Sequence, residues 1–225
     1  MNQNQKKRLN QISVVLLIIL IPIFICFLNF RLVAFNLVFY NEEFEKYDPY
    51  VDNDLGVAKD LLSYLRYPSI GKNYLVSFNE EEVAHLRDVK SLVQTSLWIL
   101  YISVVLLVFL VILIYNLNKE NNFELFKKIG IILVGGGLLN LILVGVFRVF
   151  MMDFKNAFTK FHHVFFLKGG WEFPADYNLV KLFPEKFFID AVNLIVFKII
   201  TTAIFVLIVG ILIVVIQNKI IKKRR

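Results

Sequence analysis

The sequence offers few side chains for covalent or metal chemistry. Its 225 residues include one cysteine, Cys26, and three histidines. A lone cysteine excludes a disulfide within the chain, and Cys26 falls in an apolar run where a thiol does not readily ionise. The chain also lacks a GxSxG nucleophile elbow, an HExxH zinc motif, a Gly-rich phosphate loop and a CxxC pair. These absences leave no recognisable Ser or Cys nucleophile.

Apolar residues are abundant instead. They make up 58% of the chain, with 23 phenylalanines, which is too apolar for an ordinary soluble domain of this length. Four runs approach the roughly 20 residues that a helix needs to cross a bilayer. We therefore predict an α-helical integral membrane protein with four transmembrane helices, forming one membrane domain over residues 1–225. The predicted spans are residues 12–28, 92–114, 129–147 and 191–216.

Basic residues predict the orientation of these spans. Eleven Lys and Arg lie in the first eight residues, in the 116–128 connection and in the tail after residue 216. Cytoplasmic flanks collect such residues, so both termini should be cytoplasmic and segments 29–91 and 148–190 extracytoplasmic. A basic face against anionic phospholipid accounts for the net charge of +7 without nucleic acid. The first span could instead be a cleaved secretory signal, but no small-x-small site follows it promptly.

The two outer segments are long enough to fold as a small mixed α/β cap. Residues 60–65 favour a helix and residues 73–78 a strand. Asn79 and Glu82 match a capping box, so a helix should begin at Glu80 and continue into the second span. In the second outer segment, two aromatic runs around Lys168-Gly169-Gly170 predict a hairpin.

Glycines in the third span predict close helix packing. Gly135, Gly136 and Gly137 would let a neighbouring helix approach, and Asn140 could form a hydrogen bond across that contact.

Histidines are the best remaining candidates for chemistry. His85 lies in the first outer segment and the pair His162 and His163 in the second, and these segments could converge at the lipid–water boundary. Histidine titrates near neutral pH, so two imidazoles could act as a base and an acid or electrostatic stabiliser. Asp88, one helical turn after His85, could orient its ring, and Arg87 is a candidate donor to an oxyanion.

Other interpretations of these residues remain open at this point. Interfacial histidines are often only solvated, and His85, Asp88 and His162 could also form a metal site. Glu81, Glu82 and Arg87, with Phe158 and His162 spaced FxxxH, resemble the EExxxR and FxxxH motifs of membrane-embedded prenyl-protein (CAAX) proteases. Here, however, four residues rather than three separate Glu82 from Arg87. A membrane metalloprotease, a lipid hydrolase and a non-enzymatic accessory protein are therefore alternatives.

A second resemblance covers nearly the whole chain in order. Its pieces are YNEEF from Tyr40, EEEVAHLRDVK from Glu80, FHHVFF from Phe161, Trp171, and LFPEKFF followed by Asp190. Together they resemble a family of four-span membrane proteins of Gram-positive bacteria that includes the lipoprotein intramolecular transacylases.

This resemblance implies an acyltransferase acting on diacylglyceryl lipoproteins. The sn-2 acyl chain would move to the α-amino group of the N-terminal cysteine, giving a lyso-form lipoprotein. The family's two functional histidines carry over to His85 and, by the Phe-His-x-x-Phe-Phe register, to His162, with His163 as a neighbour. The resemblance implies no cofactor. It also explains why the chain has no recognisable Ser or Cys nucleophile, because the amine can attack the ester directly.

Overall fold

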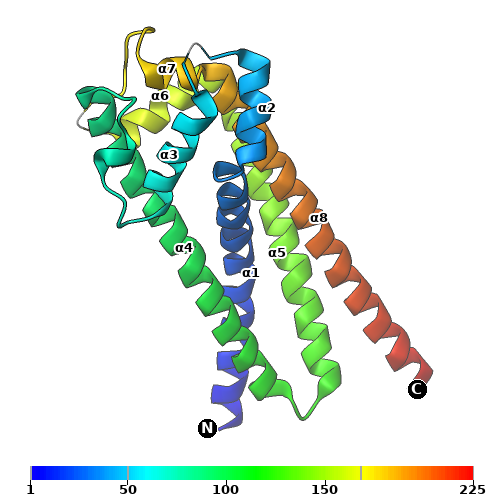
Figure 1. The fold of residues 1–225 in the computed structure, drawn as a ribbon. Helices are drawn as coiled ribbons and strands as arrows, with labels where there is room; N and C mark the ends of the chain where they lie inside the picture. Colours follow the sequence, from blue (N-terminus) through cyan, green and yellow to red (C-terminus); the bar gives the residue numbers. More distant parts are fainter. Residues whose placement is uncertain (1, 50, 168, 225) are drawn as a thin grey trace. The chain divides into compact units, whose positions relative to one another are not determined.

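The computed structural model of the protein describes residues 2–49, 51–167 and 169–224, with side chains described as far as residue 220 (Figure 1). Lys168, at the predicted hairpin, and Arg225, at the end of the basic tail, lie outside these residues. The chain forms two compact units. The first, here called the span unit, contains the chain up to Asn29, Ile99–Arg148 and the chain from Val196. The second, the site unit, contains Phe30–Trp98 and Val149–Ile195.

Within the described residues, four helices are long and apolar enough to cross a membrane, and each contains one predicted span. The prediction of a helical integral membrane protein with four spans is confirmed. Each of these helices extends well past its apolar run. They are α1 (Gln3–Ala34), α4 (Glu80–Asn118), α5 (Asn122–Phe150) and α8 (Glu185–Arg224).

Glycines set the packing inside the span unit. A Cβ added to Gly136 would lie 2.8 Å from Ile21 of α1, and one added to Gly137 would lie 3.0 Å from Leu207 of α8. The predicted close packing on α5 is therefore confirmed, with different glycines facing different helices. The predicted hydrogen bond of Asn140 is wrong, because its side chain is fully buried and neither atom of its amide has a partner in the part of the chain that the structure describes.

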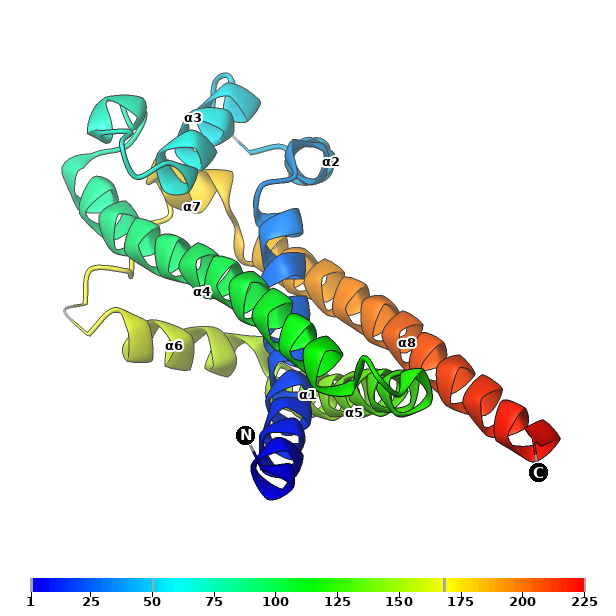
Figure 2. The ribbon, with the colours of Figure 1, turned by 90° about the horizontal axis from the view of Figure 1, so that it is seen from below.

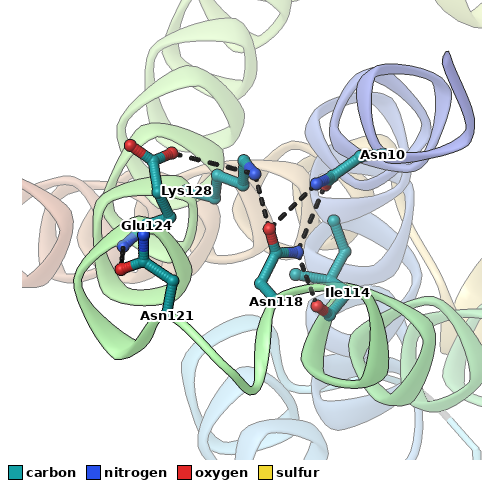
Figure 3. Close-up of polar contacts among 6 residues, drawn as sticks. All are labelled: Asn10, Ile114, Asn118, Asn121, Glu124 and Lys128. Carbon is teal, nitrogen blue, oxygen red and sulfur yellow. Dashed lines mark hydrogen bonds and ion pairs between the residues drawn. The ribbon is translucent and has the colours of Figure 1, made fainter. Parts of the chain in front are cut away.

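Polar side chains join three helix ends in the span unit (Figure 3). Asn118, at the end of α4, accepts hydrogen bonds from Asn10 of α1 at 2.9 Å and from Lys128 of α5 at 2.6 Å. Its own amide donates to the Ile114 carbonyl at 2.7 Å. Glu124 adds an ion pair to Lys128 at 3.8 Å. The start of α1 and the connection between α4 and α5 thus lie at the same end of this unit.

Short helices build the site unit (Figure 2). They are α2 (Leu37–Tyr47), α3 (Asp54–Arg66), a 3₁₀ turn at Lys72–Tyr74, α6 (Phe154–Phe165) and α7 (Asn178–Leu182). Buried side chains of α2, α3 and α7 form one apolar core with residues from the first turns of α4 and α8, including Phe39, Leu61, Leu86, Leu182 and Phe187.

The predicted α/β character of this part is wrong, because the described residues contain no strand. Residues 73–78 form turns, in which the Leu75 amide donates to the Lys72 carbonyl at 2.8 Å and the Phe78 amide to the Leu75 carbonyl at 3.1 Å. Leu75 and Phe78, three residues apart, are both buried in the core. Strand-type residues favour a strand only where a pleated surface is available to pack against. Here the buried side chains are three residues apart, whereas a strand would bury every second one.

The predicted hairpin is also wrong in its described part. Residues 154–165 form helix α6, whose N-cap Asp153 accepts a hydrogen bond from the Asn156 amide at 3.2 Å. Gly169 and Gly170 follow in the left-handed region, both with φ of 75°. Aromatics at positions 154, 158, 161 and 165 follow the helical repeat, a signal that the strand interpretation overlooked.

Candidate active site

A capping box fixes the start of α4 and thereby the position of His85. The Glu82 amide donates to Asn79 Oδ1 at 3.0 Å, and the Asn79 amide donates to Glu82 Oε2 at 2.8 Å. This confirms the predicted helix start at Glu80. His85 lies one turn beyond Glu82, before the apolar stretch of the helix, and its side chain is buried.

The same turn of α4 fastens the second outer segment. Glu82 Oε1 accepts the Leu179 amide of α7 at 2.6 Å, and Glu81 accepts the Tyr177 hydroxyl at 2.9 Å. The side-chain amide of Asn178 donates to the Ser77 carbonyl at 2.6 Å. Both oxygens of the buried Glu82 therefore accept main-chain N–H groups. Glu82 acts as a structural bridge here, which leaves it poorly placed for the metal or base role of a prenyl-protein protease.

His162 sits on the buried side of α6, where its orientation is fixed by the helix itself. Its Nδ1 lies 2.8 Å from the Phe158 carbonyl oxygen one turn earlier. A carbonyl oxygen can only accept, so Nδ1 carries the proton in this contact. In the neutral ring, Nε2 then has a free lone pair. His162 is therefore oriented as a proton acceptor.

The structure brings His85 and His162 together within the site unit. Their ring centroids are 6.1 Å apart, and the ring planes differ by 20°. Both side chains are buried, with His85 9% and His162 7% exposed. His85 Nδ1 is buried and has no hydrogen-bond partner among the described residues.

Burial lowers the pKa of both histidines. For His85, burial and then the neighbouring His162 lower the pKa to about 4, against an opposing effect of Asp88. For His162, burial also lowers the pKa, the Phe158 carbonyl opposes this, and His163 adds to it. A low pKa keeps each ring neutral at pH 7, the form that can accept a proton or donate a single N–H.

The predicted supporting residues lie at the edge of this pair. His163 is exposed and contacts Trp171 edge-on, with centroids 5.6 Å apart. Asp88 is exposed and acts on His85 only through its charge, since the described hydrogen bonds include none between them. Arg87 is exposed, and its charge acts on Tyr64. The structure therefore groups His162, and not His163, with His85, and leaves Arg87 outside the pair.

No metal cluster supports the metal interpretation of the site. Within the described residues, no group of three or more His, Cys, Asp and Glu side chains is arranged to hold an ion.

An open pocket of about 480 Å³ adjoins the histidines. Phe166 and Trp171 line it, and the same two side chains contact His162. His163 and Glu172 contribute its polar groups, and Leu167, Gly169 and Gly170 complete its lining.

Comparison with known proteins identifies the family. A model of the family described as "Lipoprotein intramolecular transacylase Lit" matches residues 12–188. The chain belongs to this family. It is accordingly a membrane transacylase, as the sequence resemblance indicated. No curated protein sequence matches the chain.

Solved structures of Lit from Bacillus cereus share the fold. One aligns with a TM-score of 0.81 at 20% identity, covering 95% of this chain and 99% of that one. A variant of that protein with an H85R mutation aligns with a TM-score of 0.77 at 20% identity, covering 97% of each chain. A variant with an H85A mutation gives 0.73 at 21% identity, covering 100% of this chain and 99% of that one.

Several side chains of this transacylase site could not be assigned from sequence. Phe158, Phe166 and Phe173 contact the two histidines, yet they are three among 23 phenylalanines. Phe158 and Phe166 lie four residues before and after His162, the spacing that places side chains on one face of a helix. This spacing was the sequence signal that could have identified Phe158 and Phe166 as neighbours of His162.

Proposed function

We propose that this transacylase moves the sn-2 acyl chain of a lipoprotein's diacylglyceryl group to the α-amino group of its N-terminal cysteine, with His162 as the base and His85 as a neutral hydrogen-bond donor. The observation that carries this assignment is the contact from His162 Nδ1 to the Phe158 carbonyl, which leaves Nε2 free to accept a proton.

The first step is removal of a proton from the amine. An α-amino group has a pKa near 8 and is mostly protonated at pH 7, so the small neutral fraction must be captured in the site. As the neutral amine attacks the sn-2 ester carbon, positive charge develops on its nitrogen, and transfer of a proton from that nitrogen to His162 Nε2 removes the charge. His162 later returns this proton to the departing glycerol oxygen. One ester and one amine become one amide and one hydroxyl, with no water consumed.

His85 is suited to a different task. With a pKa of about 4, the ring stays neutral through the physiological range. A neutral imidazole has one N–H, which can donate to the carbonyl oxygen as negative charge develops on it. Among the described residues His85 Nδ1 has no hydrogen-bond partner, which supports a role in which this ring bonds to the substrate.

Intramolecular transfer explains why no Ser or Cys nucleophile is needed. Donor ester and acceptor amine belong to one molecule, so the site has only to hold them at near-attack distance. Orientation of this kind can lower a barrier by several kcal/mol.

Product analysis tests the reaction. Purified protein in liposomes should convert a synthetic diacyl lipopeptide into a product of unchanged mass whose tandem mass spectrum places one acyl chain on the cysteine nitrogen. A lipid hydrolase would instead release free fatty acid and lower the mass of the lipopeptide by one acyl group, which would contradict the proposal.

We also infer that the site unit faces outward and lies at the bilayer surface. The basic residues near both termini and in the 116–128 connection support this orientation. Helix α6 exposes an apolar stripe of Phe161, Val164 and Phe165, with exposures of 46%, 64% and 51%. Such a stripe suits the interfacial region, where ester groups of lipids lie.

Cysteine labelling tests the orientation. In a Cys26→Ser background, a cysteine at the exposed Asp176 should react with a membrane-impermeant maleimide in intact cells. A cysteine at the exposed Lys119 should react only after permeabilisation. The reverse pattern would contradict the inferred orientation.

A further inference from the structure

Aromatic faces surround the ring of His162. Phe158 lies with its centroid 4.1 Å from that of His162, Trp171 at 4.6 Å and Phe166 at 5.2 Å. The ring planes are inclined to His162 by 43°, 33° and 28°, so these contacts are tilted or stacked rather than T-shaped. Only Phe161 contacts His162 edge-on among these described contacts, at 81°.

The surroundings of His85 are different. Phe166 is tilted by 46° at 4.6 Å, and Phe173 approaches edge-on at 5.5 Å and 73°. An aromatic face carries negative and an aromatic edge positive electrostatic potential, so a face attracts a cation and an edge repels it. Among the described contacts, His162 has three tilted or stacked aromatic neighbours and His85 has one, so the environment of His162 suits a cationic ring better.

Charged groups near His162 do not supply the attraction that an imidazolium needs. His163, on the same helix, disfavours a positive charge on His162, and His162 in turn disfavours one on His85 of α4. The Phe158 carbonyl, which accepts from Nδ1, favours it. Among the described residues no carboxylate accepts a hydrogen bond from His162, although a carboxylate is a common partner of a catalytic imidazole.

We propose that Trp171 and Phe158 form a cation–π cage that stabilises the imidazolium of His162 while it holds the proton taken from the substrate amine. This role rests on the proposed function, in which His162 is the base. The cage forms and breaks no bond. The proton arrives from the amine at Nε2 and leaves to the glycerol oxygen, and the aromatic faces favour the charged ring between those two transfers. Trp171 and Phe158 are thus positioning residues for His162.

Fluorinated tryptophan tests the cage with little change in shape. Each fluorine withdraws electron density from the indole face and weakens its attraction for a cation. Trp98 and Trp171 are the only tryptophans, so a Trp98→Phe background confines the label to residue 171. The pKa of His162 would be followed by NMR of ring-labelled histidine in nanodiscs, with indole, one-fluorine and two-fluorine side chains at 171.

The cage predicts that the pKa of His162 falls stepwise with each fluorine and that kcat falls in parallel, by about 3- to 30-fold across the series. A pKa that stays constant across the series would overturn the proposal. The matched control is a Trp171→Phe chain that keeps Trp98, in which fluorination should leave the pKa of His162 unchanged.

The two read-outs separate the cage from the reaction. A falling pKa of His162 supports the cage even if product analysis contradicts transacylation, because the titration does not depend on substrate. A constant pKa overturns the cage even if the chain transfers acyl groups normally. A purely packing role for Trp171 would lower the unfolding temperature of a Trp171→Leu chain without producing the stepwise shift.

Discussion

Replacing His162 by alanine is expected to reduce transacylation by at least about 100-fold, because a positioned general base contributes about 100- to 10,000-fold to a rate. The side chain is buried beside His85, and its free Nε2 is the proton acceptor in the proposed reaction. Initial rates of N-acyl product formation, followed by mass spectrometry in liposomes, measure the loss.

His163 provides a matched control on the same helix. It is the same residue type one position further, yet it is exposed and contacts only the edge of Trp171 in the described structure. His163→Ala should lose less than about tenfold in rate. Equal losses in the two variants would contradict the assignment of His162, and a larger loss for His163→Ala would exchange their roles.

The pH dependence gives the same assignment a second read-out. His162 accepts a proton only when neutral, and burial lowers its pKa from the ordinary value of 6.5. The rate should therefore fall on the acid side as pH drops through a value below 6.5, while the amine of the substrate titrates separately near 8. The residual rate of His162→Ala should lack the acid-side limb that lies below 6.5.

Replacing His85 by alanine is the second large expected effect. Removing one donor to a developing oxyanion costs about 100- to 1,000-fold in kcat, which corresponds to roughly 3 to 4 kcal/mol. Because the interaction strengthens only as charge develops, kcat should fall while KM changes little. Steady-state kinetics with a synthetic lipopeptide separate the two constants.

Two variants sharpen the test of His85. His85→Gln retains an N–H donor and should recover part of the lost rate if it reaches the same oxygen. Asp88→Asn removes a nearby charge without removing a hydrogen bond, so it should lose less than about tenfold. Full activity in His85→Ala would refute the donor role, and a large loss in Asp88→Asn would show that the carboxylate does more than act through its charge.

Sequence reasoning succeeded where one physical rule dominates a segment. Apolar runs of about 20 residues have few alternatives to a spanning helix, so the four spans were predictable. The capping box at Asn79 and Glu82 depends only on neighbours three residues apart, and it gave the correct start of α4. The same local geometry placed His85 one turn further along the helix.

Sequence reasoning failed where tertiary contacts determine the local structure. Residues 73–78 carry strand-type side chains, but Leu75 and Phe78 turn into a helical core that only the folded chain creates. The predicted hairpin covered residues 163–173 and so included the end of α6, because Gly169 and Gly170 were given more weight than the helical spacing before them. The tautomer of His162 depends on the Phe158 carbonyl and becomes visible once residues 154–165 are helical.

The long-range bridge from Glu82 to Leu179 was equally out of reach from the sequence. Its partners are 97 residues apart, and no local pattern links a capping glutamate to the amide of a distant helix. The bridge matters for the site because it joins the first turn of α4 to the segment that follows Trp171. His85 lies one turn further along the same helix.

A double-label product analysis most directly tests whether the acyl chain passes from the ester to the amine of the same lipopeptide at the site of His85 and His162. Wild-type protein would receive an equimolar mixture of two lipopeptides, one with a deuterated sn-2 chain and one with a ¹³C-labelled cysteine. Direct attack of the amine on its own ester predicts N-acylated products that carry one label or the other, and at least about 100-fold slower formation of these products by His162→Ala. Products carrying both labels would reveal an acyl chain passed through the enzyme or between substrates and would contradict the account.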